Sequence, residues 1–292
     1  LFAEKLAIPV PSTWTVQKME DLRELYPRLP LAIKPSIKEN FFYATGAKAW
    51  RADTPEQFCE IFNRAIEHIP ADEAMIQEIV PGDGSTQYSY CAFVVDGEPQ
   101  STLIARRGRQ HPREFGRAAT YVETTERPEV EELSRRFLKA LKYHGLVEIE
   151  FKFDARDQQY KLLDVNARAW GFHSLGMAAG VDFCYMLFAD KFGERLTPVR
   201  ARPGVGWVRV VTDIPTAWSQ IAAGYIPFKE YLTSLRNSRS EAIFAADDIM
   251  PSIAELVFLP YLVVKKLLPK KKNEEVMNGQ TKQRQLYKND VG

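Results

Sequence analysis

Two neighbouring stretches of the sequence alternate polar and apolar side chains in a way that could bring several oxygen ligands together. In GLVEIEF, residues 145–151, the acids are Glu148 and Glu150. Residues two apart in a β-strand point to the same side, so these acids share one face and their apolar neighbours fill the other. The second stretch is LLDVNAR, residues 162–168. By the same alternation, Leu163 and the apolar residues two and four positions later should point away from the polar side chains. The polar side chains of this second stretch are Asp164, Asn166 and Arg168.

The two stretches are joined by ARDQQ, residues 155–159, a cluster typical of a turn, so the sequence predicts an antiparallel hairpin. Pairing the strands would bring Glu150, Asp164 and Asn166 together. This all-oxygen set suits Mg²⁺ better than zinc, and Mg²⁺ usually adds water and phosphate oxygens to one or two protein carboxylates. Arg168 beside this set would suit an anion, because its planar guanidinium matches carboxylate or phosphate oxygens. The alternative is a hairpin whose polar face only contacts water.

The composition is that of a globular protein. The chain has 292 residues, 45% of them hydrophobic and 26% charged, with a formal net charge of +1. This length is enough for one large domain or two modest ones. The near-neutral charge argues against nucleic acid as a partner. The three cysteines are scattered without a CxxC pair, as is typical of buried thiols in a reducing compartment, so the expected location is the cytoplasm.

Hydrophobic patterns and turn signals predict the elements around the hairpin. A buried strand ends at Lys34, and Thr54-Pro55-Glu56 is a good start for an amphipathic helix. The expected strands are residues 31–33, 74–80, 87–95, 100–106 and 206–213. The expected helices are residues 54–69, 129–143 and 172–192.

A basic cluster follows the strand expected at residues 100–106. It consists of Arg106, Arg107 and Arg109, next to His111. Such a cluster at a strand end usually lies on a hydrated surface, and anion binding is the alternative.

The C-terminal part of the chain is apolar over residues 252–268 and then rich in lysine up to residue 272. Its apolar segment contains Glu255 and Pro260 and does not favour a transmembrane helix. Two interpretations are open: a helix packed on the domain, or a helix on a membrane surface with a polybasic end. Residues 273–292 are polar and predicted to be disordered.

Taken together, these features resemble the ATP-grasp superfamily over about residues 8–196. The resemblance is carried by IPVPSTW, LAIKPS, MIQEIVPG, EIEF and DVNAR, which occur in the order that the family has. It implies an α+β fold, the ATP-grasp fold, in which two α+β subdomains clamp ATP between them. The group that the chain resembles most is the predicted carboxylate–amine ligases, whose core is similar to that of carbamoyl-phosphate synthase.

The resemblance implies where ATP binds. Lys34 reaches the phosphates of the nucleotide, and residues 36–47 form a mobile loop that covers them. The backbone of Glu78 and Val80 holds the adenine at a hinge strand, and Asp83 is the nearest acid for the ribose. The full set of implied ATP ligands is Lys34, Lys48, Gln77, Glu78, Ile79, Val80, Asp83 and Gln87.

The resemblance also assigns roles to the hairpin. The implied ligands for Mg²⁺, or for Mn²⁺ in its place, are Glu150, Asp164 and Asn166. The implied catalytic residues are Arg168, Lys48 and Arg106, with Arg107 as an alternative to Arg106. Two residues depart from the family pattern, because Asp164 and Gln87 stand where Glu is common, and the covering loop is poor in glycine.

The activity implied by the resemblance is that of an ATP-dependent ligase. Such an enzyme converts a small carboxylate, for example that of an amino acid, into an acyl phosphate that an amine attacks, with release of ADP and phosphate. Two alternatives are an ATP-grasp kinase that phosphorylates a small-molecule acceptor, and a non-catalytic nucleotide-binding module at a membrane surface. The expected partners are therefore ATP, a carboxylate and an amine, with membrane contact through the C-terminal segment as an option. The oligomeric state is left open.

The resemblance further predicts how the chain is divided, with the family's N-terminal domain preceding Leu1. The expected parts are residues 1–15 as the tail of that domain, 16–80 as the small ATP-grasp subdomain, 81–196 as the C-terminal subdomain with the metal site, 197–272 as a C-terminal extension and 273–292 as a disordered tail.

Overall fold

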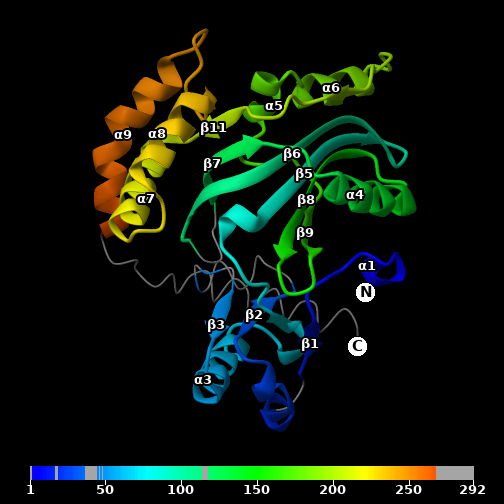
Figure 1. Ribbon diagram of the computed structural model, residues 1–292, viewed down its shortest axis with the longest axis vertical. Coiled ribbons are helices and arrows are strands. Elements are labelled where there is room, and N and C mark those ends of the chain that lie inside the picture. Colours follow the sequence, from blue (N-terminus) through cyan, green and yellow to red (C-terminus); the bar gives the residue numbers. More distant parts are fainter. Residues whose placement is uncertain are drawn as a thin grey trace, which may run out of the picture. The chain divides into compact units, whose positions relative to one another are not determined.

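The computed structural model of the chain describes residues 2–16, 19–36, 45, 47, 49–113 and 118–267 (Figure 1). The chain divides into two units, residues 1–242 and 243–292. The first unit contains two β-sheets, and the second contains the helix α9 (Met250–Leu267). The predicted covering loop is described only in part, and Lys48 and residues 273–292 lie outside the described residues.

A four-stranded antiparallel sheet with the strand order β1-β4-β2-β3 forms the small subdomain. Its strands are β1 (Thr13–Thr15), β2 (Leu31–Pro35), β3 (Trp50–Ala52) and β4 (Ala74–Glu78). The helix α3 (Pro55–Ile66) and the 3₁₀ segments η1 (Met19–Arg28) and η2 (Ala71–Glu73) complete it. The core of this subdomain is apolar and closed to solvent, and it includes Leu31, Ile33, Phe58, Phe62 and Ile76.

The helix α3 begins where the sequence predicts. Thr54 Oγ1 accepts a hydrogen bond from the backbone N–H of Gln57 at 3.3 Å, and Pro55 occupies the first turn. Phe58 and Phe62 lie four residues apart on one face and are buried. This helix therefore covers the small sheet, although it ends at Ile66, before the predicted residue 69.

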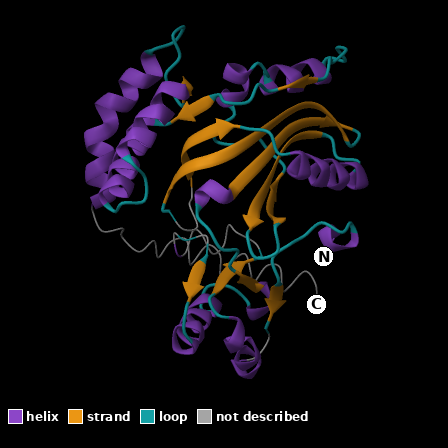
Figure 2. Ribbon diagram, viewed as in Figure 1, coloured by secondary structure: helices purple, strands orange, loops and turns teal. Residues whose placement is uncertain are grey.

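A larger sheet has the strand order β12-β11-β7-β6-β5-β8-β9, and β10 pairs with β6. Figure 2 shows the strands of the two sheets as separate groups. The strands of the larger sheet are β5 (Gln87–Val95), β6 (Glu98–His111), β7 (Ala118–Thr124), β8 (Gly145–Asp154), β9 (Gln159–Asn166), β10 (Val199–Arg200), β11 (Gly206–Val208) and β12 (Ser238–Glu241). The remaining elements of this unit are α1 (Phe2–Lys5), η3 (Gly84–Thr86), α4 (Pro128–Leu141), α5 (Ser174–Ala179), α6 (Phe183–Lys191), α7 (Val210–Ala222) and α8 (Phe228–Asn237).

The two faces of the large sheet differ in chemistry. On one face, Tyr90, Ile149 and Phe151 are buried in a core that includes residues of α4. On the other face, an apolar half that includes Phe93 packs against α5 and α6. The strand alternation that places Phe93 there also places polar residues of β5 and β8 on the same face, among them Ser89. The hairpin therefore presents a polar region beside a hydrophobic core, as the alternation predicts.

Two sequence-based predictions about secondary structure are wrong. The single helix expected at residues 172–192 is two helices, because Gly180 adopts a left-handed conformation (φ +97°) that ends α5. Asp182 then begins α6, accepting a hydrogen bond from the Tyr185 N–H at 2.9 Å. The strand expected at residues 206–213 ends at Val208, and a helix follows.

The three short strands β10, β11 and β12 are hydrogen-bonded into the large sheet. They belong to residues 197–242, which the sequence analysis assigns to an extension. This part of the chain therefore contributes to the sheet that carries the hairpin, while the predicted division of the chain stays a prediction.

The helix α9 matches the apolar segment expected at residues 252–268. Several large apolar side chains of this helix are exposed, among them Val257 and Phe258. No helix in the described ranges is long and apolar enough to cross a membrane.

A buried ion pair attaches α7 and α8 to the large sheet. Arg109 Nε and Nη2 lie 2.8 and 2.7 Å from the two carboxylate oxygens of Asp213, and Nη1 donates to Ser234 Oγ at 2.8 Å. The rings of Tyr121 and Tyr231 lie 4.4 and 5.0 Å from the guanidinium carbon. Asp213 is fully buried, so each charge depends on the other for solvation.

We predict that Asp213→Asn strongly destabilises the large sheet. The substitution keeps the side-chain shape but leaves the buried Arg109 guanidinium without its counter-charge, which typically costs about 3–5 kcal/mol. Urea unfolding followed by circular dichroism would measure this loss of unfolding free energy. The control is Glu132→Gln, which removes an exposed ion pair with Arg136 on α4 and should change the value by less than about 1 kcal/mol. Equal effects of the two substitutions would contradict the structural role of the buried pair.

Candidate functional site

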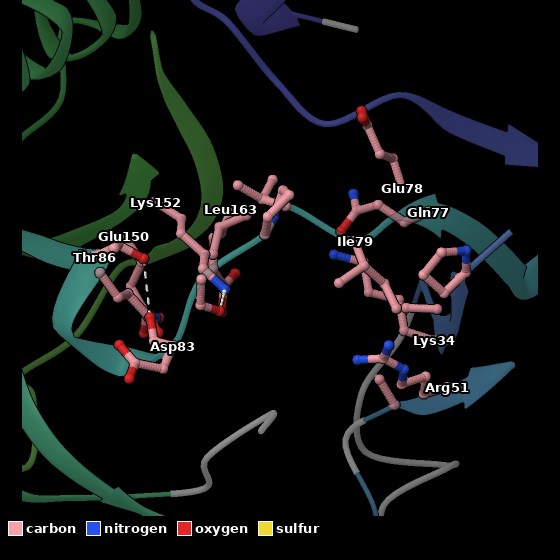
Figure 3. A pocket seen from close by; sticks show the side chains of 18 of the residues that line it. Lys34, Arg51, Gln77, Glu78, Ile79, Asp83, Thr86, Glu150, Lys152 and Leu163 are labelled. Atoms are coloured by element: carbon pink, nitrogen blue, oxygen red, sulfur yellow. Dashed lines mark hydrogen bonds between the residues drawn. The ribbon is translucent and has the colours of Figure 1, made fainter. Parts of the chain in front are cut away.

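A cavity of about 890 Å³ lies between the small and the large sheet (Figure 3). In Figure 3, Lys34 and Arg51 lie on one side of it, and Asp83, Thr86 and Glu150 lie on the other. Most of the predicted ATP and metal ligands line this cavity. They are Lys34, Gln77, Glu78, Ile79, Val80, Asp83, Gln87, Glu150 and Asp164. Of the other predicted residues, Lys48 lies outside the described part of the chain, and Arg106, Asn166 and Arg168 are not part of the wall.

The hairpin of β8 and β9 brings the predicted metal ligands together. The strands pair antiparallel, with Glu150 opposite Asp164 and Glu148 opposite Asn166. The Asn166 amide nitrogen lies 3.3 Å from Glu150 Oε1. Cross-strand neighbours therefore supply two carboxylates and an amide within a small volume, as the alternation predicts.

Leu163 contradicts the simple alternation along β9. We expected it to point away from the polar face, but it lines the cavity. The reason is a bulge: Asp164 pairs with Glu150 and Leu162 with Phe151, so Leu163 is an extra residue without a partner in the register. The bulge gives the cavity an apolar residue directly beside an acid.

Lys34 approaches the acids from the small sheet. Burial lowers the pKa of Lys34, and the carboxylates of Asp164 and Glu150 oppose this effect by favouring its charged form. The lysine at the end of β2 and the acids of the hairpin thus act on one another across the cavity. This arrangement places a cation opposite two anions, with room between them for a further charged molecule.

Arg107, and not Arg106, is the arginine of β6 in this cavity. Its Nη2 atom lies 2.8 Å from Glu150 Oε1, and its side chain is buried. Arg106 lies on the opposite face of the strand, where it pairs with Glu123 at 3.4 Å. The sequence analysis left Arg106 and Arg107 open as alternatives. Once β6 is seen to continue to His111, strand alternation alone separates the two arginines.

A bulge at Gly108 decides where the following side chains point. The register of β6 against β7 shifts between Arg107 and Arg109, with Gly108 as the extra residue. A Cβ atom at Gly108 would lie 2.4 Å from a ring carbon of Tyr121, so only glycine fits. As a result, Arg107 and Gln110 line the cavity, whereas Arg109 reaches α7.

Glu148 is a second buried acid of the site, to which the sequence analysis gave no role. Its Oε1 atom accepts a hydrogen bond from Ser89 Oγ at 2.9 Å and lies 3.5 Å from Arg107 Nη2. Burial, and then the charge of Glu150, raise the pKa of Glu148, while Arg107, Ser89 and Arg168 act in the opposite direction. Its place on the polar face of β8 was visible in the sequence, but its burial was not.

Gln87 and Arg168 are held by the same group of side chains. Gln87 donates from its amide nitrogen to Glu150 Oε2 at 2.8 Å, so it orients this carboxylate. Arg168 donates from Nη2 to Asn166 Oδ1 at 2.9 Å and is exposed. The arginine therefore stands at the solvent side of the acids.

The segment after β4 is fixed by contacts from distant parts of the chain. The Glu78 N–H donates to Ser12 O at 2.9 Å, and the Ser12 N–H donates to the Glu78 carboxylate at 3.2 Å. Arg156 at the tip of the hairpin also donates to this carboxylate, and Lys161 lies 3.8 Å away. Burial alone would raise the pKa of Glu78, but Ser12, Arg156 and Lys161 outweigh it and hold the pKa below its usual value. The side chain of Glu78 thus connects the end of β4 to Ser12 and to the β8–β9 hairpin.

Asp83 follows this segment and also lines the cavity. It accepts hydrogen bonds from the N–H and the hydroxyl of Ser85 and pairs with Arg113 at 3.1 Å. Burial would raise the pKa of Asp83, but these donors outweigh it and lower the pKa. The side-chain nitrogen of Gln77 is engaged with Thr13 Oγ1 at 2.9 Å.

The donor set of the cavity wall fits Mg²⁺. Glu150 and Asp164 offer carboxylate oxygens from paired strands, and Asn166 adds an amide beside them. Within the described ranges, no group of three or more His, Cys, Asp or Glu side chains is placed to hold a metal. Mg²⁺ usually takes one or two protein carboxylates and completes its coordination shell with water and phosphate oxygens, so the oxygen ligands present are sufficient for it.

Comparison with known proteins bears on the family and the fold. The family model described as "ATP-grasp in the biosynthetic pathway with Ter operon" matches residues 92–213. A D-aspartate ligase of Enterococcus faecium (strain Aus0004) is 25% identical over 175 residues, which are 56% of this chain and 42% of that protein.

Two solved structures share the fold. The biotin carboxylase domain of the Hydrogenobacter thermophilus 2-oxoglutarate carboxylase, solved with MgADP, ADP and bicarbonate, aligns with a TM-score of 0.56 at 14% identity. N5-carboxyaminoimidazole synthetase of Staphylococcus aureus complexed with ADP also aligns with a TM-score of 0.56, at 13% identity. The alignments cover 70% of this chain and 47% and 52% of those chains.

The chain thus spans about half the length of the proteins that it matches. The predicted fold, with two α+β subdomains around a cavity, is confirmed by these structural neighbours. The segment matched by the family model, residues 92–213, includes the hairpin with its acids. Residues 92–213 thus match an ATP-grasp family model, and the described part of the chain has the ATP-grasp fold.

Proposed function

We propose that the chain carries the ATP site of a carboxylate–amine ligase, which activates a small carboxylate as an acyl phosphate. The observation that carries this proposal is the cavity in which Lys34 faces Glu150 and Asp164. A cation and paired acids on opposite walls are what a nucleotide triphosphate with a divalent metal requires. The likeness to a D-aspartate ligase supports the ligase class and leaves the acid and the amine of this protein open.

In this proposal, the segment after β4 holds the adenosine. The backbone of Glu78 and Val80 contacts the adenine, Ile79 and Leu163 supply apolar surface, and Asp83 accepts from the ribose. The contacts that engage the Glu78 side chain support a backbone role for this residue. Gln77 contributes to ATP binding through its main chain, because its side-chain amide nitrogen donates to Thr13 Oγ1.

The phosphates lie between the two walls. Lys34, and Lys48 beyond the described residues, neutralise phosphate oxygens from the small subdomain. Glu150, Asp164 and Asn166 hold Mg²⁺, or Mn²⁺ in its place, on the hairpin. When bound, the ion neutralises the charge on the transferred phosphate and keeps it in line for attack. Gln87 and Arg107 keep Glu150 in position for this task.

The reaction then has two steps. A carboxylate oxygen of the substrate bonds to the γ-phosphorus while the bond to ADP breaks, which gives an acyl phosphate. The nitrogen of the amine attacks the acyl carbon, the bond to phosphate breaks, and the amine loses a proton. Arg168 lies on the solvent side of Glu150 and Asp164. There it holds the carboxylate of the substrate and stabilises the charge that develops on it. Of the two alternatives Arg106 and Arg107, we assign this role to Arg107, because it lines the cavity.

We predict that hydroxylamine traps the acyl phosphate. The protein is incubated with Mg·ATP, hydroxylamine and single carboxylates from a panel of amino acids and other small acids, and ADP and hydroxamate are measured. ADP formed together with the hydroxamate of one acid is the expected result, and it identifies that acid. ADP that depends on a small-molecule acceptor without any hydroxamate would favour the kinase. ATP binding without turnover would favour the non-catalytic module, and a liposome flotation assay would then test its expected membrane contact.

We predict that Asp164→Asn lowers Mg²⁺-dependent ATP turnover by at least about 100-fold, because loss of outer-shell partners alone costs 10–100-fold. Asp164 is exposed, so the melting temperature should hardly change. The matched control is Asp157→Asn in the hairpin turn, where the acid pairs with Lys161 away from the cavity. Normal turnover in Asp164→Asn would remove Asp164 from the metal site.

We predict that Lys34→Ala weakens ATP binding by about 10-fold or more, since a charge-assisted hydrogen bond to phosphate contributes about 1.5–3 kcal/mol. Isothermal titration calorimetry with ATP and Mg²⁺ measures this change. Lys139→Ala, which removes a highly exposed lysine of α4, is the control and should bind ATP normally. An unchanged ATP affinity in Lys34→Ala would exclude a phosphate contact for this lysine.

A further inference from the structure

Arg156 lies in the turn between β8 and β9 and connects this hairpin to the end of β4. Its Nη2 atom donates to Glu78 Oε1. Because β4 belongs to the small sheet and the hairpin to the large sheet, this ion pair joins the two subdomains. Glu78 lines the cavity, whereas Arg156 is not part of its wall. Of the two acids that hold Arg156, Asp154 and Glu78, the second is thus the one at the cavity.

A buried acid holds the other side of the Arg156 side chain. The backbone N–H and Nε of Arg156 lie 3.0 and 2.9 Å from Asp154 Oδ1, and Nη2 lies 2.6 Å from Oδ2. Asp154 is fully buried at the end of β8, so its charge depends on these donors and on Lys161, whose Nζ lies 2.7 Å from Oδ2. The guanidinium is therefore fixed to the large sheet on the side away from Glu78.

The carboxylate of Glu78 divides its two oxygens between different partners. Oε2 accepts from the Ser12 N–H at 3.2 Å and lies 3.8 Å from Lys161 Nζ, which is beyond hydrogen-bond distance. Oε1 accepts from Arg156. In Figure 3, the side chain of Glu78 points away from Lys34. Arg156 is therefore the residue that hydrogen-bonds Glu78 to the large sheet.

The main chain at Glu78 is where strand pairing ends. β4 pairs with β2 up to Glu78, which lies opposite Leu31, and the residues that follow up to Asp83 form no strand. In the proposed function, main-chain groups of Glu78 and Val80 contact the adenine. Such hydrogen bonds need donor and acceptor about 2.7–3.2 Å apart, so a shift of the main chain by about 1 Å breaks them. Contacts that fix this main chain therefore decide how well a base is recognised.

We propose that Arg156 is a positioning residue for base recognition. Through Glu78, it holds the end of β4 where the main chain can distinguish adenine from a base with the opposite hydrogen-bonding pattern. This inference rests on the adenine site of the proposed function. It gives the β8–β9 hairpin a second task at its turn, apart from that of the acids on its strands.

The test compares ATP with inosine triphosphate. Adenine offers an NH₂ donor and a ring-nitrogen acceptor at the edge where hypoxanthine has a carbonyl acceptor and an N–H donor, while the ribose and phosphates are the same. Isothermal titration calorimetry in Mg²⁺ measures both dissociation constants, and their ratio is the base preference. We expect the wild-type protein to prefer ATP, and Arg156→Gln to lower this preference by about 3- to 10-fold. Changes in phosphate binding cancel in the ratio.

A double-mutant cycle shows whether Arg156 acts through Glu78. Glu78→Gln should lower the base preference by a similar factor, and Arg156→Gln should have no further effect in the Glu78→Gln background. The matched control is Arg135→Gln, which removes an exposed arginine that pairs with Glu131 on α4. This control should keep the full preference.

Each outcome has a distinct meaning. An unchanged preference in Arg156→Gln, or effects of the two substitutions that add, would overturn the positioning role alone. A wild-type protein that binds both nucleotides equally would overturn the main-chain adenine site and this inference with it, and one that binds neither would overturn the proposed function. Lys161 still pairs with Asp154 in Arg156→Gln, so we expect this variant to fold. Should thermal melting show that it does not, Glu78→Gln tests the same contact, and an unchanged preference there would overturn the role.

Discussion

Arg107 lies between Glu148 and Glu150 on a sheet face whose other half is a hydrophobic core. Burying two ionised acids on one strand face costs less when a cation lies between them, because their charges repel and burial removes the water that would screen them. Arg107 supplies this cation from β6 by reaching across β5. The polar half of the face is therefore one connected set of charged side chains. The position of Arg107 restricts where the carboxylates of Glu148 and Glu150 can lie.

The small sheet depends on this set as well. Lys34 is half-buried at the end of β2, and the acids of the hairpin favour its charged form. Burial disfavours the charged form of a lysine because it removes hydrating water, and a nearby anion opposes this effect. The hydrophobic cores of the two sheets provide the rigid walls, and the charges on those walls define the space that remains between them.

Strand periodicity was enough to predict the hairpin, its polar face and the pairing of Glu150 with Asp164. It failed at single extra residues, because one bulge reverses the alternation without any change in composition. Before the bulge of β9, Tyr160 and Leu162 pack on the apolar core, and after it Val165 does so. The choice between Arg106 and Arg107 could not be made from periodicity, since the face of β6 that meets the cavity depends on its partner strands.

Other features depended on contacts between distant parts of the chain and could not be predicted from local patterns. Apolar residues from Gly206 onward predict a strand, but Asp213 is the partner of Arg109 more than a hundred residues earlier, and a helix brings it there. Burial of Glu148 likewise depends on Ser89 and Arg107. Sequence periodicity gives the direction of a side chain, whereas its partners follow only from the assembled sheet.

The carboxylate of Glu78 contacts two distant segments of the chain: Ser12 on one side, and Arg156 and Lys161 of the β8–β9 hairpin on the other. Such a tie removes conformational freedom from the backbone of the following residues when the chain folds. A nucleotide base that binds there would meet main-chain groups that are already ordered, so less entropy would be lost on binding. For such a ligand, the affinity would depend partly on three residues whose side chains need not touch it.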